Sequence, residues 1–104
     1  MVRIEYVENP TPSRERIWYE EIEDVSLSVD PMFVYITYSV ADKEKSGYRT
    51  WSRIGYQETI AGNILYTNLI IGDERYSDER IRRNPALIRS LLENERVESQ
   101  LQEL

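Results

Sequence analysis

Residues 32–54 carry the strongest structural pattern in the chain: two runs of alternating side chains joined by a polar segment. From Met32 to Val40 every second residue is large and mostly apolar, and residues 48–54 resume the same two-residue period. β-Branched and aromatic side chains lose rotamer freedom in a helix and pack well on a pleated sheet. The pattern predicts an antiparallel hairpin whose charged turn, residues 41–47, lies at the surface.

Shorter alternating runs on the N-terminal side of this hairpin predict two further strands. Residues 2–6 alternate and are followed by two prolines within residues 9–12, which we expect to end the first strand. In residues 16–29 the apolar side chains change from one parity to the other. Because such a change moves the buried face, it predicts a bulge near Glu23 and Asp24.

On the C-terminal side, Gly55 is expected to bend the chain before a short strand over residues 56–61. Gly62 and Asn63 both tolerate positive φ and predict a two-residue hairpin turn. The nearly continuous apolar run over residues 64–71 is typical of a central strand covered on both faces.

The period changes after Gly72 from two residues to that of a helix. Ser77 is expected to cap a short helical turn, and the pair Asn84-Pro85 has the cap and first-turn residues of a second helix. Leu87, Ile88, Leu91 and Leu92 form an apolar stripe that would pack on the sheet.

These elements predict one α+β domain over residues 1–104, strand-rich over 1–72 and helical over 77–104. The expected architecture is a mostly antiparallel sheet, or a small partly open barrel of five to seven strands, with a C-terminal helix. A chain of 104 residues with 40% hydrophobic residues can form one modest core.

Composition excludes most familiar catalytic sites. The chain has no histidine and no cysteine, so Ser-His-Asp, Cys-His and imidazole-metal chemistry cannot operate. The four glycines are dispersed and form no phosphate-binding loop. A carboxylate-only site, at residues 20–24 or at Asp73 and Glu74, is the remaining route to an enzyme. We therefore expect a non-enzymatic protein without a cofactor or a bound metal.

The formal net charge is −6, and most of the excess lies in the first half. Residues 1–47 hold ten acidic and five basic side chains, whereas residues 48–104 hold nine and eight. Such acidity argues against a general duplex-DNA binder. No apolar stretch has the length of a signal peptide or a membrane span, which predicts a soluble cytoplasmic protein.

The first candidate binding site is Arg49, Trp51 and Arg53. Alternation on a strand would place an indole between two guanidinium groups on one face, an arrangement suited to stacking a nucleic-acid base. The acidic net charge favours another interpretation. Trp51 would then lie in the core or pack across strands, with the arginines stacked on it or paired with the acidic strands.

The second candidate is the acidic group of Glu20, Glu21, Glu23 and Asp24. On a strand edge these carboxylates could bind a basic partner or imitate nucleic-acid phosphate. Charge on an edge strand also protects against aggregation, which is the simpler interpretation.

Tyrosine, tryptophan and arginine, the residues that most often anchor protein interfaces, are abundant here. The expected function is a small acidic protein-interaction module, such as a subunit, adaptor or inhibitor, that can form homo-oligomers. It would bind another protein through an aromatic and arginine-rich face of the sheet and through the C-terminal helix. One alternative is single-stranded nucleic-acid binding through Arg49, Trp51 and Arg53, and a second is an acidic inhibitor that imitates phosphate.

Overall fold

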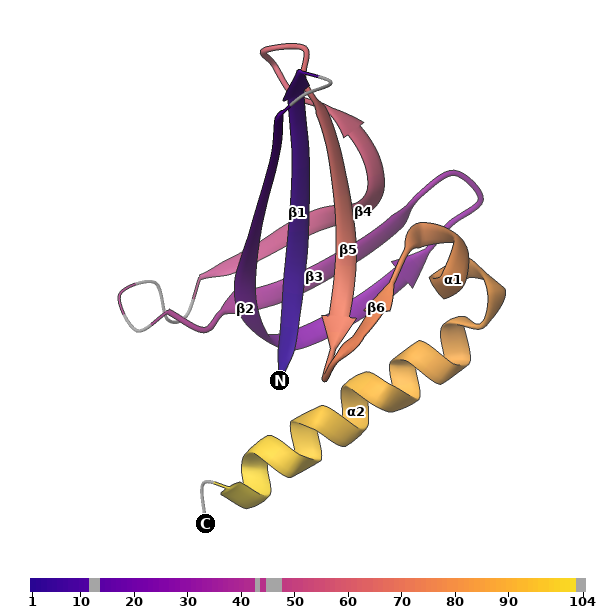
Figure 1. Cartoon of the computed structure of the whole chain (residues 1–104). Coiled ribbons are helices and arrows are strands. Elements are labelled where there is room, and N and C mark those ends of the chain that lie inside the picture. The colour runs from indigo at the N-terminus through magenta and orange to yellow at the C-terminus, as the bar shows by residue number, and fades with distance from the viewer. Residues whose placement is uncertain (12–13, 43, 45–47, 103–104) are drawn as a thin grey trace.

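The computed structural model describes residues 1–11, 14–42, 44 and 48–102. It contains six strands followed by two helices, as Figure 1 shows. The strands are β1 (Val2–Thr11), β2 (Arg14–Val29), β3 (Val34–Val40), β4 (Arg49–Glu58), β5 (Ile64–Ile71) and β6 (Glu74–Tyr76). The helices are α1 (Asp78–Arg83) and α2 (Pro85–Gln102).

The strands pair in chain order, and β1 also pairs with β5. Five strands thereby close into a barrel, and β6 extends the sheet beyond β5. Every pairing is antiparallel. The α+β class, the antiparallel barrel and the C-terminal helix expected from the sequence are confirmed.

Closing five antiparallel strands requires bends, because β1 and β5 would otherwise run in the same direction. β2 pairs with β1 up to Ile22 and with β3 from there on, and β4 changes partner from β3 to β5 at Gly55. Figure 1 shows both strands turning from one layer of the barrel into the other. The barrel is therefore two crossed layers that share two bent strands.

Each bend has a local backbone cause. Asp24 has a φ of 51° at the register shift between Glu23 and Ser26, so the predicted bulge is confirmed. Gly55 has a φ of 116°, a conformation that other residues rarely adopt. It bends β4 internally, so the separate strand predicted over residues 56–61 is instead the second half of β4.

Two further predictions at strand ends are wrong in detail, and one short strand was not predicted. β1 continues through Pro10 to Thr11, because the proline lies at a register irregularity where it need not donate to the ladder. The turn after β4 is longer than two residues, with Gly62 N–H donating to the Thr59 carbonyl. The strand β6 was not expected, since three residues carry too short a pattern to read.

The core lies between the two layers and under the helices. Its buried side chains come from all six strands and both helices: Val2, Ile4, Ile22, Val34, Ile36, Tyr38, Val40, Ile54, Leu69, Ile71, Tyr76, Ile81, Ile88 and Leu92. β5 is buried on both faces only in its second half, because Ile64 and Tyr66 remain exposed. The predicted central strand is thus partly confirmed.

In Figure 1, α1 lies beside β6 at the right of the barrel, and α2 runs below the barrel. Ser77 caps α1 by accepting a hydrogen bond from the Arg80 amide at 3.2 Å, as predicted. In α2, the side chain of Asn84 accepts from the Leu87 amide, and Ile88 and Leu92 are buried. Leu87, which was expected to join them, is exposed.

We predict that Gly55→Asn destabilises the protein by about 2 kcal/mol or more, because its φ is unfavourable for a side chain. A Cβ atom there would also lie 3.2 Å from the Cβ of Asp78 in α1. Gly72→Asn is the matched control, since its φ of 61° lies in the region that asparagine tolerates. Urea unfolding measures the free energy of unfolding of both variants. An equal loss of stability in the two would contradict the role assigned to Gly55.

Candidate functional site

The outer surface of the β3–β4 hairpin carries an exposed aromatic group, here called the aromatic face. The register pairs Tyr35 with Arg53 and Thr37 with Trp51, so these side chains point away from the core. Trp51 is 67% exposed. Its ring meets that of Tyr35 edge-on at 5.9 Å, and Tyr35 meets Phe33 at 5.8 Å. The face consists of Phe33, Tyr35, Arg49, Trp51 and Arg53.

Both predicted arginines lie on the aromatic face, but each has a partner within the protein. The guanidinium of Arg53 lies 3.8 Å from the centroid of the Phe33 ring. Arg49 donates from Nη1 to the backbone carbonyl of Asp24 at 2.9 Å. The strand register also confirms that Arg49, Trp51 and Arg53 share one face, as the sequence predicted.

The interpretation of Trp51 as a core residue is wrong. The inward positions of this hairpin are taken by the other parity, including Ile36, Tyr38 and Ile54, and these fill the barrel. Cross-strand packing is present, although the ring beneath an arginine is Phe33 and not Trp51.

The acidic residues of the second candidate do not lie on one face. Glu20 is on the inward parity of β2, in register with Ile4 of β1, whereas Glu21 follows the outward parity. Glu21, Glu23 and Asp24 instead line a groove of about 770 Å³ between β2 and α2. Strand alternation therefore separates Glu20 from the three acidic residues that follow it in the sequence.

A second groove, here called the side groove, opens where β2 separates from the β3–β4 hairpin. None of the described strands pairs with the second edge of β2 over residues 14–20. The resulting space has a volume of about 670 Å³. It is lined by Glu20, Tyr38, Val40, Glu44, Tyr48, Thr50 and Trp51.

Polar side chains occupy the barrel interior near the side groove. The Tyr38 hydroxyl lies 3.1 Å from Ser52 Oγ, and the Tyr6 hydroxyl lies 3.5 Å from the Glu20 carboxylate. Burial raises the pKa of Tyr6 above its usual range; the neighbouring Tyr38 and Glu20 add to this, and the Ser52 hydroxyl opposes it. Tyr6 therefore remains a neutral donor at physiological pH.

This interior cluster was not recognised from the sequence. Tyr6, Glu20, Tyr38 and Ser52 come from four different strands, and each fits the alternation of its own strand. The available signal was Glu20, a glutamate on the same parity as the apolar Ile22, which indicates a polar group inside the barrel.

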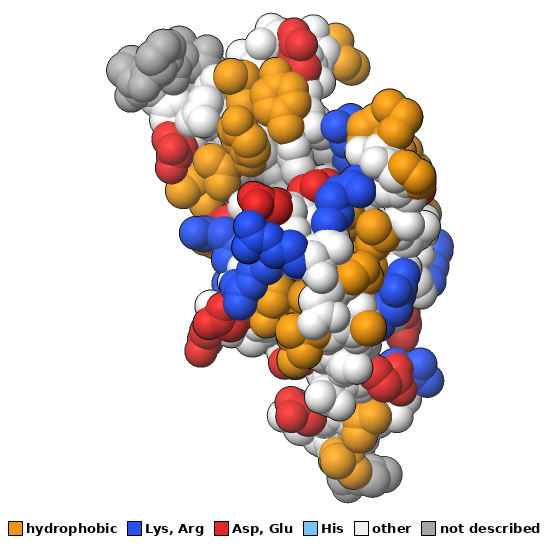
Figure 2. Space-filling model, turned by 90° about the vertical axis from the view of Figure 1, so that its right-hand side faces the viewer, with side chains coloured by type: hydrophobic (Ala, Val, Ile, Leu, Met, Phe, Trp, Pro, Cys, Tyr) orange, Lys and Arg blue, Asp and Glu red, His pale blue; other side chains and the backbone are white. Residues whose placement is uncertain are grey.

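A buried carboxylate, Glu5, is held on the outside of the barrel. Its side chain is 1% exposed. Arg75 of β6 binds it with both Nε and Nη2, at 2.8 and 2.9 Å, and the Tyr19 hydroxyl and the Asn68 amide donate to it as well. Figure 2 shows basic side chains gathered at mid-height of the side formed by β5, β6 and α1. The network joins β6 to the barrel.

Burial alone would raise the pKa of Glu5, but the hydrogen bonds from Arg75, Tyr19 and Asn68 outweigh it and lower that pKa. The bond to Glu5 raises the pKa of the Tyr19 hydroxyl. All four acceptor positions of the Glu5 carboxylate are occupied, so its role is structural.

No protein-family model matches this chain, and neither the curated proteins nor the solved structures contain a significant match. Within the described residues there is no group of three or more acidic, histidine or cysteine side chains placed to hold a metal ion. Asp73 lies in the turn between β5 and β6, and Glu74, the first residue of β6, pairs with Arg80 at 3.0 Å. The described helices include none that is long and apolar enough to cross a membrane.

We predict that Glu5→Gln lowers the free energy of unfolding at pH 7 by about 1 to 3 kcal/mol. Because the folded-state pKa of Glu5 lies below its ordinary value of about 4.5, the stabilisation is present above that pH. It is lost as the pH falls through the folded-state pKa.

Urea unfolding between pH 3 and pH 7 tests this, with the exposed Glu15→Gln as the matched control. The difference in stability between Glu5→Gln and the wild type should shrink below pH 4.5, while Glu15→Gln should follow the wild type throughout. A pH-independent difference for Glu5→Gln would contradict the assignment.

Proposed function

We propose that this protein is a non-enzymatic protein-interaction module, an adaptor, subunit or inhibitor, that binds a protein partner through the aromatic face. The observation that carries the proposal is the exposure of Trp51, which is 67% exposed at the centre of that face. Tyr35 contacts its ring, and Phe33 contacts the ring of Tyr35. A large exposed indole on a rigid sheet has the properties of an interface hot spot.

The charges around Trp51 also favour a protein partner. Arg49 and Arg53 lie on either side of the indole, while Asp24 and Glu23 of β2 lie across the hairpin. A surface with an aromatic centre and charges of both signs at its rim resembles the anatomy of protein interfaces. Because Arg49 and Arg53 already have partners within the protein, they are less suited to neutralising a chain of phosphates.

The aromatic face is also pre-organised. Tyr35, Trp51 and the two arginines project from paired strands, and Phe33 directly precedes β3. The ring contacts at 5.8 and 5.9 Å limit the motion of the three aromatic side chains. Binding therefore costs less conformational entropy than it would for side chains on a loop. The proposed setting is the cytoplasm, with which a chain without cysteine is compatible.

Single-stranded nucleic-acid binding is the alternative, and the same exposed Trp51 between two arginines supports it. Bases stack on exposed aromatic side chains of small barrels. Under this alternative, labelled oligonucleotides should bind at low salt, and affinity should fall steeply as salt increases. Fluorescence anisotropy with DNA and RNA oligomers measures this directly.

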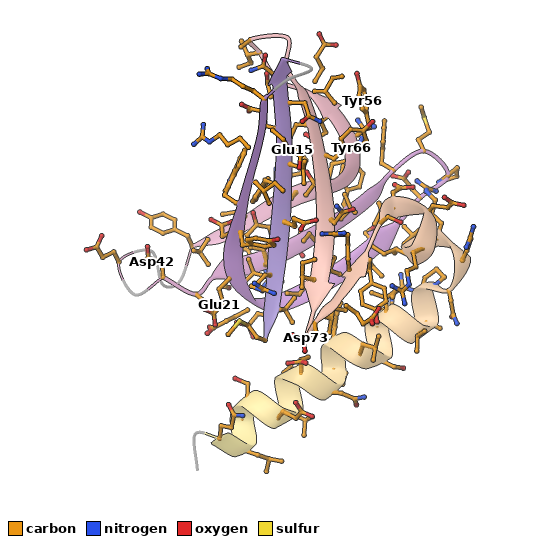
Figure 3. All side chains as sticks on the ribbon, in the orientation of Figure 1. Glu15, Glu21, Asp42, Tyr56, Tyr66 and Asp73 are labelled. Atoms are coloured by element: carbon orange, nitrogen blue, oxygen red, sulfur yellow. The ribbon has the colours of Figure 1, made fainter. Side chains whose placement is uncertain are left out.

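We predict that Trp51→Ala leaves the fold intact but weakens partner binding by about 30-fold, the loss typical of a hot-spot residue. The test is affinity capture from the source cell's lysate, with and without nuclease. Tyr56→Ala is the matched control, because Tyr56 is an exposed aromatic residue of the same strand that contacts Tyr66 on another part of the barrel (Figure 3).

A stoichiometric protein that survives nuclease, is retained by Tyr56→Ala and is lost with Trp51→Ala would support the proposal. Circular dichroism checks that both variants fold. Capture of nucleic acid that depends on Trp51 would favour the alternative. A protein partner that binds Trp51→Ala as well as the wild type would overturn the role of the aromatic face.

A further inference from the structure

The first half of β2 has one edge with which no described strand pairs. Between Arg14 and Ile22 this strand pairs with β1, but its other edge meets β3 only from Ile22 onward. The amide of Ala41 donates to the Glu21 carbonyl at 3.2 Å, so pairing on that side begins at Glu21. Residues 14–20, here called the free edge, run along the left side of the barrel in Figure 1.

The composition of the free edge favours pairing with another strand. Residues 14–20 include no proline, glycine or lysine, the residues that most often interrupt or protect a strand edge. Ile17 and Tyr19, on the outer face, are each 48% exposed, and β-branched and aromatic side chains fit a pleated sheet. The remaining protection is charge, which acts only where like charges would meet.

The order of charges along the free edge is self-complementary. Two copies of a strand that pair antiparallel about a two-fold axis place each residue opposite the one at the same distance beyond the axis. Ile17 is the midpoint of residues 14–20, so pairing along the whole free edge places Ile17 opposite its own copy. Arg14 then lies opposite Glu20 of the second copy, and symmetry forms this pair of opposite charges twice.

The other cross-strand pairs of this register are compatible as well. Arg16 lies opposite Trp18 of the second copy, and within one chain the Arg16 guanidinium already lies 5.0 Å from the centroid of the Trp18 ring. Glu15 lies opposite Tyr19. Moving the axis by one residue would place two Arg16 side chains opposite each other, or Glu15 opposite Glu21. Like charges directly opposite are unfavourable, so the register centred on Ile17 is preferred.

An apolar row on the outer surface of the barrel ends at the free edge. The register places Ile17 of β2 opposite Val7 of β1. Val7 is in turn opposite Tyr66 of β5, and Tyr66 is opposite Tyr56 of β4. Ile17, Tyr66 and Tyr56 are all exposed. Pairing of two free edges would join this row to its copy and would bury Ile17 at the centre of the contact.

We propose that this protein forms a two-fold symmetric dimer in which the free edge of β2 pairs antiparallel with the same edge of a second copy, with Ile17 on the axis. Main-chain N–H and C=O groups bond across the axis, and β1, β2 and their copies form one continuous sheet. The paired segment is short, so the dimer exchanges with the monomer and depends on protein concentration. The interface uses no residue of the aromatic face.

The test is sedimentation equilibrium of the purified protein over a wide range of concentrations. We expect a monomer–dimer equilibrium for the wild type. Ile17→Asp and Ile17→Lys should each weaken dimerisation by about tenfold or more, because two like charges then lie opposite each other on the axis. An equimolar mixture of the two variants should regain the dimer, since aspartate then lies opposite lysine. Misfolded variants would not show this recovery.

Matched variants test the position and the register of the contact. Ile64→Lys should dimerise as the wild type does, because Ile64 is exposed on β5, which pairs there with strands on both sides. Arg14→Glu should weaken the dimer about fivefold, since it replaces two attractive pairs with repulsive ones. Arg83→Glu in α1, with the same change in net charge, should have no effect. Trp51→Ala should also dimerise normally, which separates this inference from the proposed function.

A wild type that stays monomeric at every concentration would overturn the dimer in favour of an extended segment of another protein as the occupant of the free edge. A dimer that neither Ile17 variant weakens, or a mixture of the two that stays monomeric, would overturn it as well. Loss of the dimer in Trp51→Ala would move the contact to the aromatic face, and an unchanged affinity in Arg14→Glu would contradict the register.

Discussion

The pairing of β1 with β5 is the constraint on which the rest of this structure depends. Their antiparallel register runs from Val2 opposite Ile71 to Asn9 opposite Ile64. With five strands in chain order, this closure is achieved only if intermediate strands change direction. The bulge at Asp24 and the bend at Gly55 provide the change, at backbone dihedrals of positive φ.

The same bends create the two grooves beside β2. β2 bends at Ile22. The residues of β2 before Ile22 pair with β1 but not with β3, so the side groove opens between this first half of β2 and the β3–β4 hairpin. Beyond the bulge, the second half of β2 faces α2 across the other groove. Closure of the barrel thus places Glu20 beside one groove, and Glu21, Glu23 and Asp24 beside the other.

Arginine and aromatic side chains provide much of the order on the outer surface. Arg3 and Arg80 lie over Tyr19 and Tyr76, and Arg75 secures β6 through Glu5. Because the guanidinium group can stack and donate hydrogen bonds simultaneously, arginine suits such positions better than lysine does. The aromatic face belongs to the same surface system, but its central indole remains exposed. This exposure is the physical basis for proposing that the aromatic face binds a partner.

Local pattern determined much of the fold. Alternation over residues 32–54 specified the hairpin and the face shared by Arg49, Trp51 and Arg53, because side-chain direction in a strand follows from residue parity. The parity change in β2, the cap at Ser77 and the start of α2 at Pro85 were also local signals. The predictions for the end of β1 near Pro10 and for the turn after β4 were less accurate, because the pairing partner of a strand decides where that strand ends.

Only the tertiary structure decided which face of the central hairpin is covered. Parity separates Trp51 from Ile54 but does not say which side meets the second layer, and the negative net charge suggested the wrong side for Trp51. The cluster of Tyr6, Glu20, Tyr38 and Ser52, and the bonds between Glu5 and Arg75, join residues from different strands. Such contacts arise from barrel closure and register, which are long-range properties that a local pattern cannot carry.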